Sequence, residues 1–171
     1  MINVMIDLET LGMGESAIIC SIGACTFMTT EPQKTFYHEL DIEKQPGRVF
    51  DPSTVKFWMK QGNAPVHGTY QLSSVLSGLN VWLENLKQPV IIWANGTDFD
   101  IPMLKHAYQY YCMKPNWRYD AVRDYRTMRK LFPNIKADEF TGSKHNALDD
   151  AINQAAHLTK ILHYMEDKGV Q

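Results

Sequence analysis

The sequence has few cysteines and no strong charge of either sign. Only three cysteines occur in 171 residues, Cys20, Cys25 and Cys112, and none forms a C-x-x-C pair. An odd number without such pairs excludes a disulfide framework and a zinc site, so we expect buried thiols in a reducing cytoplasm. The formal net charge of −2 argues against a broadly basic surface for nucleic acid.

Long hydrophobic runs and linkers are also missing. No apolar run approaches the ~20 residues needed to span a bilayer, and the opening MINVMIDLET carries acids where a signal peptide needs bases. We therefore expect no membrane partner and a cytoplasmic location. Without repeats or a Pro/Gly/Ser-rich linker, residues 1–171 are predicted to form one domain, long enough to bury a sizeable core.

The apolar patterns that are present predict an α/β protein. Runs rich in β-branched residues indicate strands, and apolar residues spaced three and four apart indicate helices. The predicted strands are 2–9, 17–27, 35–40, 90–94 and 119–122. The predicted helices are 72–86, 102–111, one from about 126, and 147–165, with a short helix after Pro52. This order predicts a mixed sheet with helices on its faces.

Two acids lie side by side at the end of the first predicted strand. Alternation along a strand sends Asp7 and Glu9 to the same face. Two neighbouring carboxylates repel each other unless a cation lies between them, and oxygen ligands select hard ions such as Mg²⁺ or Mn²⁺. A solvated strand end would show the same residues, so this pair needs further carboxylates to indicate a metal site.

Two further acidic pairs occur where strands and helices meet. Asp98 and Asp100 follow the buried strand 90–94, where sites lie in open α/β sheets, although either residue could instead cap the next helix. Asp149 and Asp150 begin the last helix, and Asn146 is its predicted N-cap. Asp149 matches the acidic partner of a capping box, a structural role that leaves Asp150 unexplained.

Three segments together resemble the motifs of a known enzyme family. IDLET at 6–10, NGTDFD at 95–100 and HNALDD at 145–150 are similar, in order and spacing, to the motifs of DnaQ-like, DEDDh-type 3'-5' exonucleases. The segments MIDLETLG, WANGTDFDIPML and RDYRTM further resemble phage and prophage exonucleases and RNase T-like exoribonucleases. The resemblance covers most of the chain.

The resemblance implies an RNase H-like fold with a mixed five-stranded sheet flanked by helices. It implies that two Mg²⁺ ions, or Mn²⁺ as a substitute, are held by four acids, Asp7, Glu9, Asp100 and Asp150. His145 would be the general base, because imidazole titrates nearest neutral pH. The expected activity is metal-dependent 3'-5' removal of nucleoside monophosphates from single-stranded ends, with DNA slightly favoured over RNA.

Substrate contacts are expected from four residues. Thr10 and Leu11 correspond to family positions that contact the terminal nucleotide, and Asn95 belongs to the second motif. Trp58, beside Phe57, is a candidate for stacking on the terminal base, with core packing as an equal alternative. By the same resemblance, a homodimer is a candidate assembly.

Positive charge is concentrated in residues 105–136. This basic block holds eight Lys or Arg and two acids, interleaved with six Tyr or Trp residues. Such a composition is typical of a surface that binds single-stranded nucleic acid, but solvated basic faces over aromatic cores would show the same residues.

His145 follows Thr141-Gly142-Ser143, and we expect this loop to order when substrate and metal bind. The main rival function is a catalytically silent module that binds nucleic acid or protein. Every motif residue is retained in this sequence, which argues against such a module.

Overall fold

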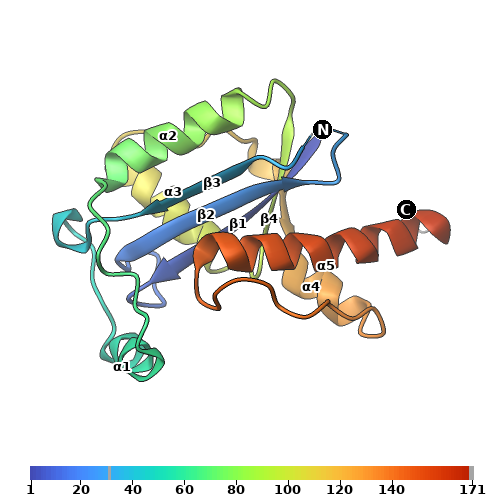
Figure 1. Cartoon of the computed structure of the whole chain (residues 1–171). Helices are drawn as coiled ribbons and strands as arrows, with labels where there is room; N and C mark the ends of the chain where they lie inside the picture. The colour runs from blue at the N-terminus through green and yellow to red at the C-terminus, as the bar shows by residue number, and fades with distance from the viewer. Residues whose placement is uncertain (31, 170–171) are drawn as a thin grey trace.

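The computed structural model describes residues 1–30 and 32–169, which form three layers, a mixed sheet between two layers of helices (Figure 1). The strands are β1 (Ile2–Thr10), β2 (Ile19–Phe27), β3 (Thr35–Glu39), β4 (Val90–Ala94) and β5 (Val122–Asp124). Their order in the sheet is β3-β2-β1-β4-β5. The pairs β1–β2 and β2–β3 are antiparallel, and β1–β4 and β4–β5 are parallel. The predicted fold class is confirmed.

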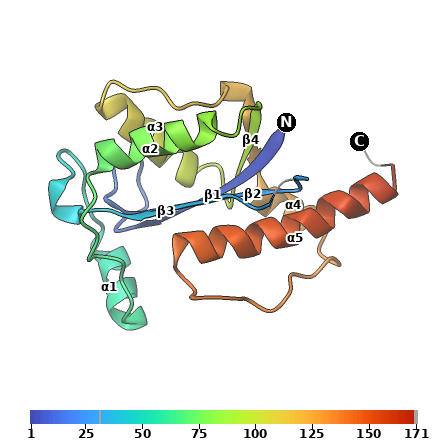
Figure 2. The same ribbon diagram turned by 45° about the horizontal axis from the view of Figure 1, so that its top comes forward.

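Helices cover both faces of the sheet. They are α1 (Pro52–Gln61), α2 (Leu72–Glu84), α3 (Asp100–Tyr110), α4 (Tyr125–Leu131) and α5 (Ala147–Asp167). Figure 2 shows α2 and α3 on one face, α4 and α5 on the other, and α1 projecting beyond the sheet. Within the described residues, no helix is both long and apolar enough to cross a bilayer.

Side-chain alternation along β1 divides the interior into two cores. Val4 and Ile6 pack with residues of α2 and α3, whereas Met5 packs with residues of α5 on the other face. Asp7 continues the Met5 face because successive side chains alternate. The acidic end of β1 is therefore directed toward the side of the sheet that α5 covers.

Three local predictions need correction. Residues 119–121 form a 3-10 turn, and the strand begins at Val122, where pairing with Ile92 of β4 becomes available. The helix predicted from 102 begins at Asp100, within the turn that follows β4. Cys20 and Cys25 are buried as expected, but Cys112 is exposed because it lies in the turn that ends α3.

Candidate active site

The three motifs meet in one pocket of about 460 Å³ at the carboxyl ends of β1 and β4. Its lining includes all four candidate metal ligands and the candidate base: Asp7, Glu9, Asp100, His145 and Asp150. β1 and β4 are parallel neighbours, so their carboxyl ends share one edge of the sheet. This edge brings together residues that are more than 140 positions apart in the chain.

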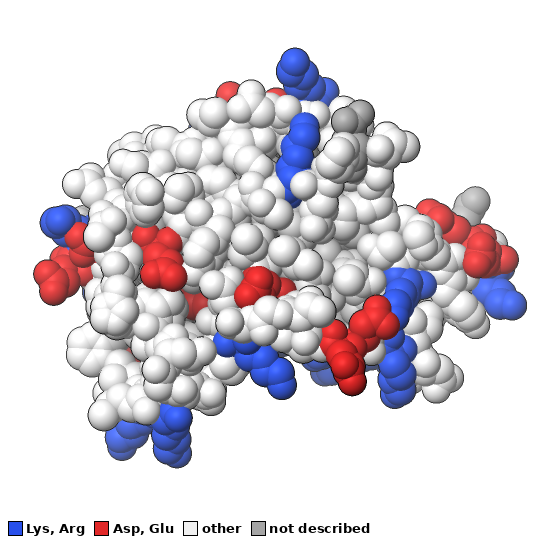
Figure 3. Space-filling model, in the orientation of Figure 1, with Lys and Arg blue, Asp and Glu red and all other residues white. Residues whose placement is uncertain are grey.

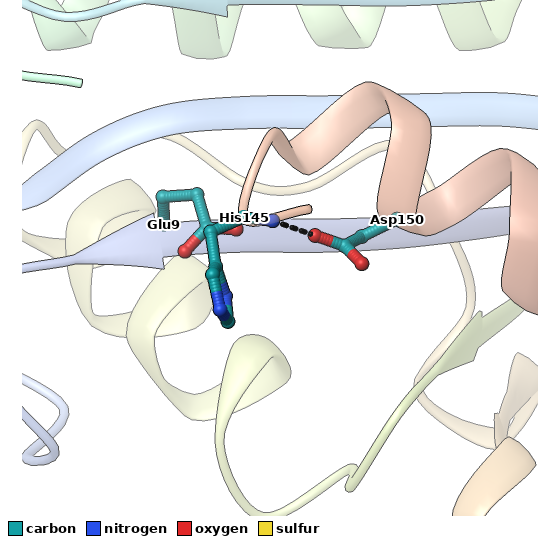
Figure 4. Close-up of side chains that lie close together, drawn as sticks. All are labelled: Glu9, His145 and Asp150. Carbon is teal, nitrogen blue, oxygen red and sulfur yellow. Dashed lines mark hydrogen bonds between the residues drawn. The ribbon is translucent and has the colours of Figure 1, made fainter. Parts of the chain in front are cut away.

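The first-motif acids lie against α5. Asp7 Oδ1 accepts a 2.8 Å hydrogen bond from Gln154 Nε2, and Glu9 is buried nearby. One carboxylate oxygen of Glu9, one of Asp150 and one ring nitrogen of His145 all lie within 4.8 Å of one another. Figure 4 shows these three side chains arriving from β1, from the loop before α5 and from the first turn of α5.

Burial distinguishes the acids of the second motif. Asp100 is only 2% exposed, and its Oδ1 accepts a 3.1 Å bond from the Leu8 N–H. Leu8 lies beyond Met5, the last β1 residue that pairs with β4, so the Asp100 carboxylate takes the place of a β4 partner. The Asp98 side chain is 84% exposed. Neither acid caps α3, since its N-cap, Phe99, makes no side-chain cap bond.

The third motif is organised around the start of α5. Asn146 is the N-cap, as predicted, and its Oδ1 accepts from the N–H groups of Leu148 and Asp149. The predicted capping box is wrong, because Asp149 accepts instead from the Ser143 N–H at 2.8 Å. Asp150 turns toward the pocket and accepts from the His145 N–H at 2.8 Å (Figure 4).

His145 is held in an unusual backbone conformation. Its φ of +63° lies in the left-handed region, which non-glycine residues seldom adopt. Its ring packs edge-on against Phe57 and Trp58, with ring centroids 5.1 and 5.9 Å away. The preceding loop is also tied to α5 through Thr141 and Asn153. These contacts define one placement of the loop, and its ordering by substrate stays a prediction.

The carboxylates of the pocket destabilise one another's charged forms. Burial, followed by the charges of Asp150 and Asp100, raises the pKa of Glu9 to about 8. Burial and the charges of Asp100 and Glu9 raise the pKa of Asp7 well above its usual range. Burial raises the pKa of Asp100 to about 7, and burial also raises the pKa of Asp150. Bound cations would relieve this repulsion.

A second, more apolar pocket of about 380 Å³ adjoins the first, with which it shares Leu8, Glu9, Met13 and Phe99. Thr10 and Trp58 line it, but Trp58 is 3% exposed and its indole N–H donates to the Thr10 carbonyl. Trp58 is therefore held in place as part of the lining of this pocket, whereas the side chain of the neighbouring Phe57 is more exposed.

The other two predicted substrate residues differ in position. Leu11 packs in a small core with Cys20 and Trp58 and lines neither pocket. Asn95 lines the candidate catalytic pocket, in which the three motifs meet, and its buried side-chain oxygen accepts no hydrogen bond. Asn95 therefore presents an unused polar atom at the site, as Gln154 does through its buried Oε1.

Much of the aromatic character of the basic block serves the core. Tyr108, Trp117 and Tyr125 are buried, which favours the core alternative for these three rings. On the face shown in Figure 3, Lys and Arg side chains occur in separate groups and form no continuous band. Of the eight bases in the block, Arg126 alone lines the candidate catalytic pocket.

Sequence reasoning missed the contribution of Gln154. A helical signal was available, because Gln154 follows Asp150 by four residues and so lies on the same face of α5. What the sequence did not reveal is that this face meets Asp7. Such a contact depends on how α5 docks on β1.

Comparisons with known proteins agree with this arrangement. The family model described as "3'-5' exoribonuclease Rv2179c-like domain" matches residues 2–162. The nuclease domain of 3'hExo, a DEDDh family member bound to rAMP, superposes with a TM-score of 0.64 at 16% identity, covering 99% of this chain and 93% of that one. No curated protein matches the chain.

Longer exonucleases share the same fold. Exonuclease I of Methylocaldum szegediense has a TM-score of 0.71 at 12% identity, over 98% of this chain and 41% of that one. E. coli exonuclease I, in complex with a 5cy-dA13 oligonucleotide, has a TM-score of 0.68 at 13% identity, over 95% and 40%. The chain thus spans about two fifths of these exonuclease I proteins, and the likeness at this identity shows the fold.

Proposed function

The chain belongs to the Rv2179c-like 3'-5' exoribonuclease domain family, and from that membership we propose that it is a metal-dependent 3'-5' exonuclease releasing nucleoside monophosphates from single-stranded ends. The observation that carries this proposal is the convergence of Glu9, His145 and Asp150 within 4.8 Å, in the same pocket as Asp7 and Asp100.

The donor set fits a pair of divalent cations. Asp7, Glu9, Asp100 and Asp150 supply only oxygen ligands, the kind that Mg²⁺ and Mn²⁺ prefer. Their raised pKa values reflect burial and, for Asp7 and Glu9 especially, mutual repulsion, both of which cation binding would offset. Bound Mg²⁺ would supply an activated water and charge neutralisation at the leaving oxygen.

The chain's own residues have separate proposed roles. His145 accepts the proton of the attacking water, and Asp150 holds the His145 backbone through its N–H. Gln154 keeps the Asp7 carboxylate directed into the pocket. The terminal nucleotide would bind in the apolar pocket, which Thr10 and Trp58 line. Leu11 would act indirectly, because it packs against Trp58 in the core behind this pocket.

We propose RNA as the preferred substrate in place of the slight preference for DNA. The family description names an exoribonuclease, and 3'hExo was studied with rAMP. DNA remains the comparison substrate, because E. coli exonuclease I was studied with DNA oligonucleotides. A cytoplasmic location and a homodimer complete the proposal.

The testing experiment is digestion of 5'-end-labelled single- and double-stranded RNA and DNA with Mg²⁺, with Mn²⁺ and with EDTA. We expect stepwise shortening from the 3' end in metal alone, fastest on single-stranded RNA. Internal cuts, or full activity in EDTA, would contradict the proposal. No cleavage together with tight oligonucleotide binding would support the silent binding module instead.

A variant of the proposed base provides the first prediction. His145→Ala should lower turnover by about 10²- to 10⁴-fold, the usual contribution of general base catalysis, while metal binding measured by calorimetry is retained. His163→Ala, an exposed histidine on α5, is the matched control. Near-normal turnover of the His145 variant would remove this residue from the mechanism.

A further inference from the structure

We propose that Arg126 and Arg129, on one face of α4, bind successive phosphates of the substrate strand on the 5' side of the bond that is cut. Resting on the proposed exonuclease function, this inference deepens it by giving the strand a direction across the surface.

The Arg126 guanidinium packs against the loop that follows β4. Its Nη2 donates a 2.8 Å hydrogen bond to the Asn95 carbonyl. Gly96 lies directly beside the guanidinium, with a φ of +106°, and a Cβ at this position would come within 2.6 Å of Arg126 Nη2. Glycine at position 96 therefore both adopts the turn and leaves room for the arginine.

The same loop is joined to the start of α4 through Asp124. Its Oδ1 accepts from the Thr127 N–H at 3.0 Å and caps the helix. Its Oδ2 lies 3.4 Å from both the backbone nitrogen and the hydroxyl of Thr97. This double role fixes α4 relative to the pocket, so the Arg126 guanidinium is held in place before any ligand binds.

The guanidinium has binding capacity left for an anion. Its ion pair is with Asp98, 3.9 Å from Nη1, and that carboxylate is 84% exposed. An exposed ion pair at this distance contributes little and is readily exchanged. The charge of Arg126 also acts on the buried Asp100, with which it forms no ion pair within 4 Å. Among the described residues, Arg126 is the only Lys or Arg that lines the catalytic pocket. Arginine binds phosphate through parallel N–H donors, which suits this position.

Arg129 continues the basic face of α4 into a neighbouring pocket, which Asp138 and Asp150 also line. It lies one helical turn after Arg126, hence on the same face of α4. It lines a neighbouring pocket of about 220 Å³, which shares Asn95, Asp150 and Gln154 with the catalytic pocket. Its guanidinium lies 5.8 Å from the centre of the Tyr125 ring, which supports the side chain through a cation–π contact.

The order of the three pockets sets the direction of the strand. The apolar pocket beside α1 shares Leu8, Glu9, Met13 and Phe99 with the catalytic pocket, and none of the Lys or Arg residues that the structure describes lines it. It suits a terminal base and sugar. The pocket beside α4 shares a different set of catalytic-pocket residues and carries Arg129. The upstream phosphates would therefore pass Arg126 first and Arg129 second.

The test pairs two variants with two substrate changes. Arg126→Gln and Arg129→Gln each remove a positive charge but keep an N–H donor, and Lys168→Gln at the far end of α5 is the charge-matched control. The substrate is a single-stranded oligonucleotide of the type that the wild-type protein degrades. It carries either all charged linkages or one uncharged methylphosphonate, placed at the first or the second linkage upstream of the terminal one.

We expect Arg126→Gln to lower kcat/KM by about 10- to 100-fold on the fully charged substrate, as loss of a charge-assisted contact predicts. On the substrate neutral at the first upstream linkage, the same variant should change kcat/KM by less than about threefold. Arg129→Gln should show this pattern for the second linkage. The melting temperatures of the variants serve to exclude misfolding.

Equal losses on charged and neutral substrates would overturn the proposal, because they would place Arg126 at the cut phosphate or in the scaffold. A loss of the same size in Lys168→Gln would overturn it too, since a general charge effect would then suffice. If the wild-type protein shortens no oligonucleotide, the proposed function itself has failed, and this outcome is distinguishable from both.

Discussion

At the scale of single residues, burial separates the two acids of the second motif, and hydrogen-bond contacts separate the two acids of the third. Asp100 is enclosed and accepts from the Leu8 N–H, whereas Asp98 lies in solvent near Arg126. In the third motif, Asp149 accepts a hydrogen bond from the Ser143 N–H, while Asp150 lines the pocket. The resemblance favoured the same members of each pair, so the burial and contacts of these acids support a choice that stays a prediction.

This difference predicts unequal effects of two similar substitutions. Asp100→Asn should lower exonuclease turnover by more than about 100-fold, because even outer partners of metal ligands commonly cost 10- to 100-fold. Asp98→Asn, the matched control, should stay within about threefold, since it perturbs only an exposed ion pair. Steady-state rates on one oligonucleotide measure both. Equal effects would contradict the assignment of Asp100.

Gln154 predicts a positioning effect that can be measured without turnover. Gln154→Leu keeps the volume of the side chain but removes the 2.8 Å hydrogen bond to Asp7. Metal affinity should fall about tenfold in calorimetry, the lower range for loss of an outer partner. Gln109→Leu, at an exposed site on α3, is the control. Unchanged affinity in a folded variant would show that Asp7 needs no such support.

At the scale of secondary-structure elements, the site depends on how closely α5 approaches the sheet. Gly23 of β2 pairs with Asp7 of β1, and a Cβ at Gly23 would overlap the backbone of Ala147. The missing side chain lets the first turn of α5, including Asp150, reach the acids of β1. One backbone position on β2 thus controls the distance between the first and third motifs.

We therefore expect Gly23→Ala to impair both stability and activity. Forcing a methyl group into packed backbone costs about 1–3 kcal/mol and would push the start of α5 away from the sheet. Gly78→Ala in α2 is the control, because its Cβ would meet the Phe36 ring at an ordinary 3.7 Å and alanine favours helices. Chemical unfolding and oligonucleotide digestion test the pair. A fully active Gly23→Ala protein would show that α5 tolerates displacement.

At the scale of the whole molecule, the mild acidity of the chain has a local origin. Without the four candidate metal ligands, seventeen bases face fifteen acids, so the formal balance becomes +2. The acids that made a nuclease look improbable are gathered in one pocket, where burial and their own charges raise the pKa of Glu9 to about 8 and burial raises that of Asp100 to about 7. The remaining surface is close to neutral, with Arg126 beside the site.

These raised pKa values predict how stability depends on pH and metal. A carboxyl whose pKa is higher in the folded state binds more protons when folded, so the metal-free protein should lose stability as pH rises from about 5 to 8. Mg²⁺ should therefore raise the melting temperature more at pH 8 than at pH 6, by about 4–8 °C for a difference of about 2 kcal/mol.

Two variants check the source of that effect. Glu9→Gln in EDTA should be more stable than the wild-type protein at pH 8 and should lose most of the response to Mg²⁺. Glu15→Gln, at an exposed position, should behave as the wild-type protein does. A Mg²⁺ response that is the same at both pH values would contradict the prediction.

The sequence by itself determined the fold class and most strands and helices, and its resemblance to the DEDDh exonucleases supplied the five residues of the candidate catalytic set. These depend on local properties: alternation along β1, helical spacing in α2 and α5, and motif residues whose chemistry is fixed by their type. Short elements were less predictable, because the turn before β5 and the start of α3 follow from pairing with a neighbouring strand and from the turn after β4.

Only the tertiary structure decided which side chains line the site. Trp58 is a buried residue that lines the apolar pocket, and Leu11 packs against it in the core. Gln154 of α5 and Arg126 of α4 line the pocket that holds the candidate catalytic residues. Burial and contact depend on how elements far apart in the chain pack together, and no local pattern carries that information. The type of chemistry was therefore visible in the sequence, whereas the orientation of the site was set by packing.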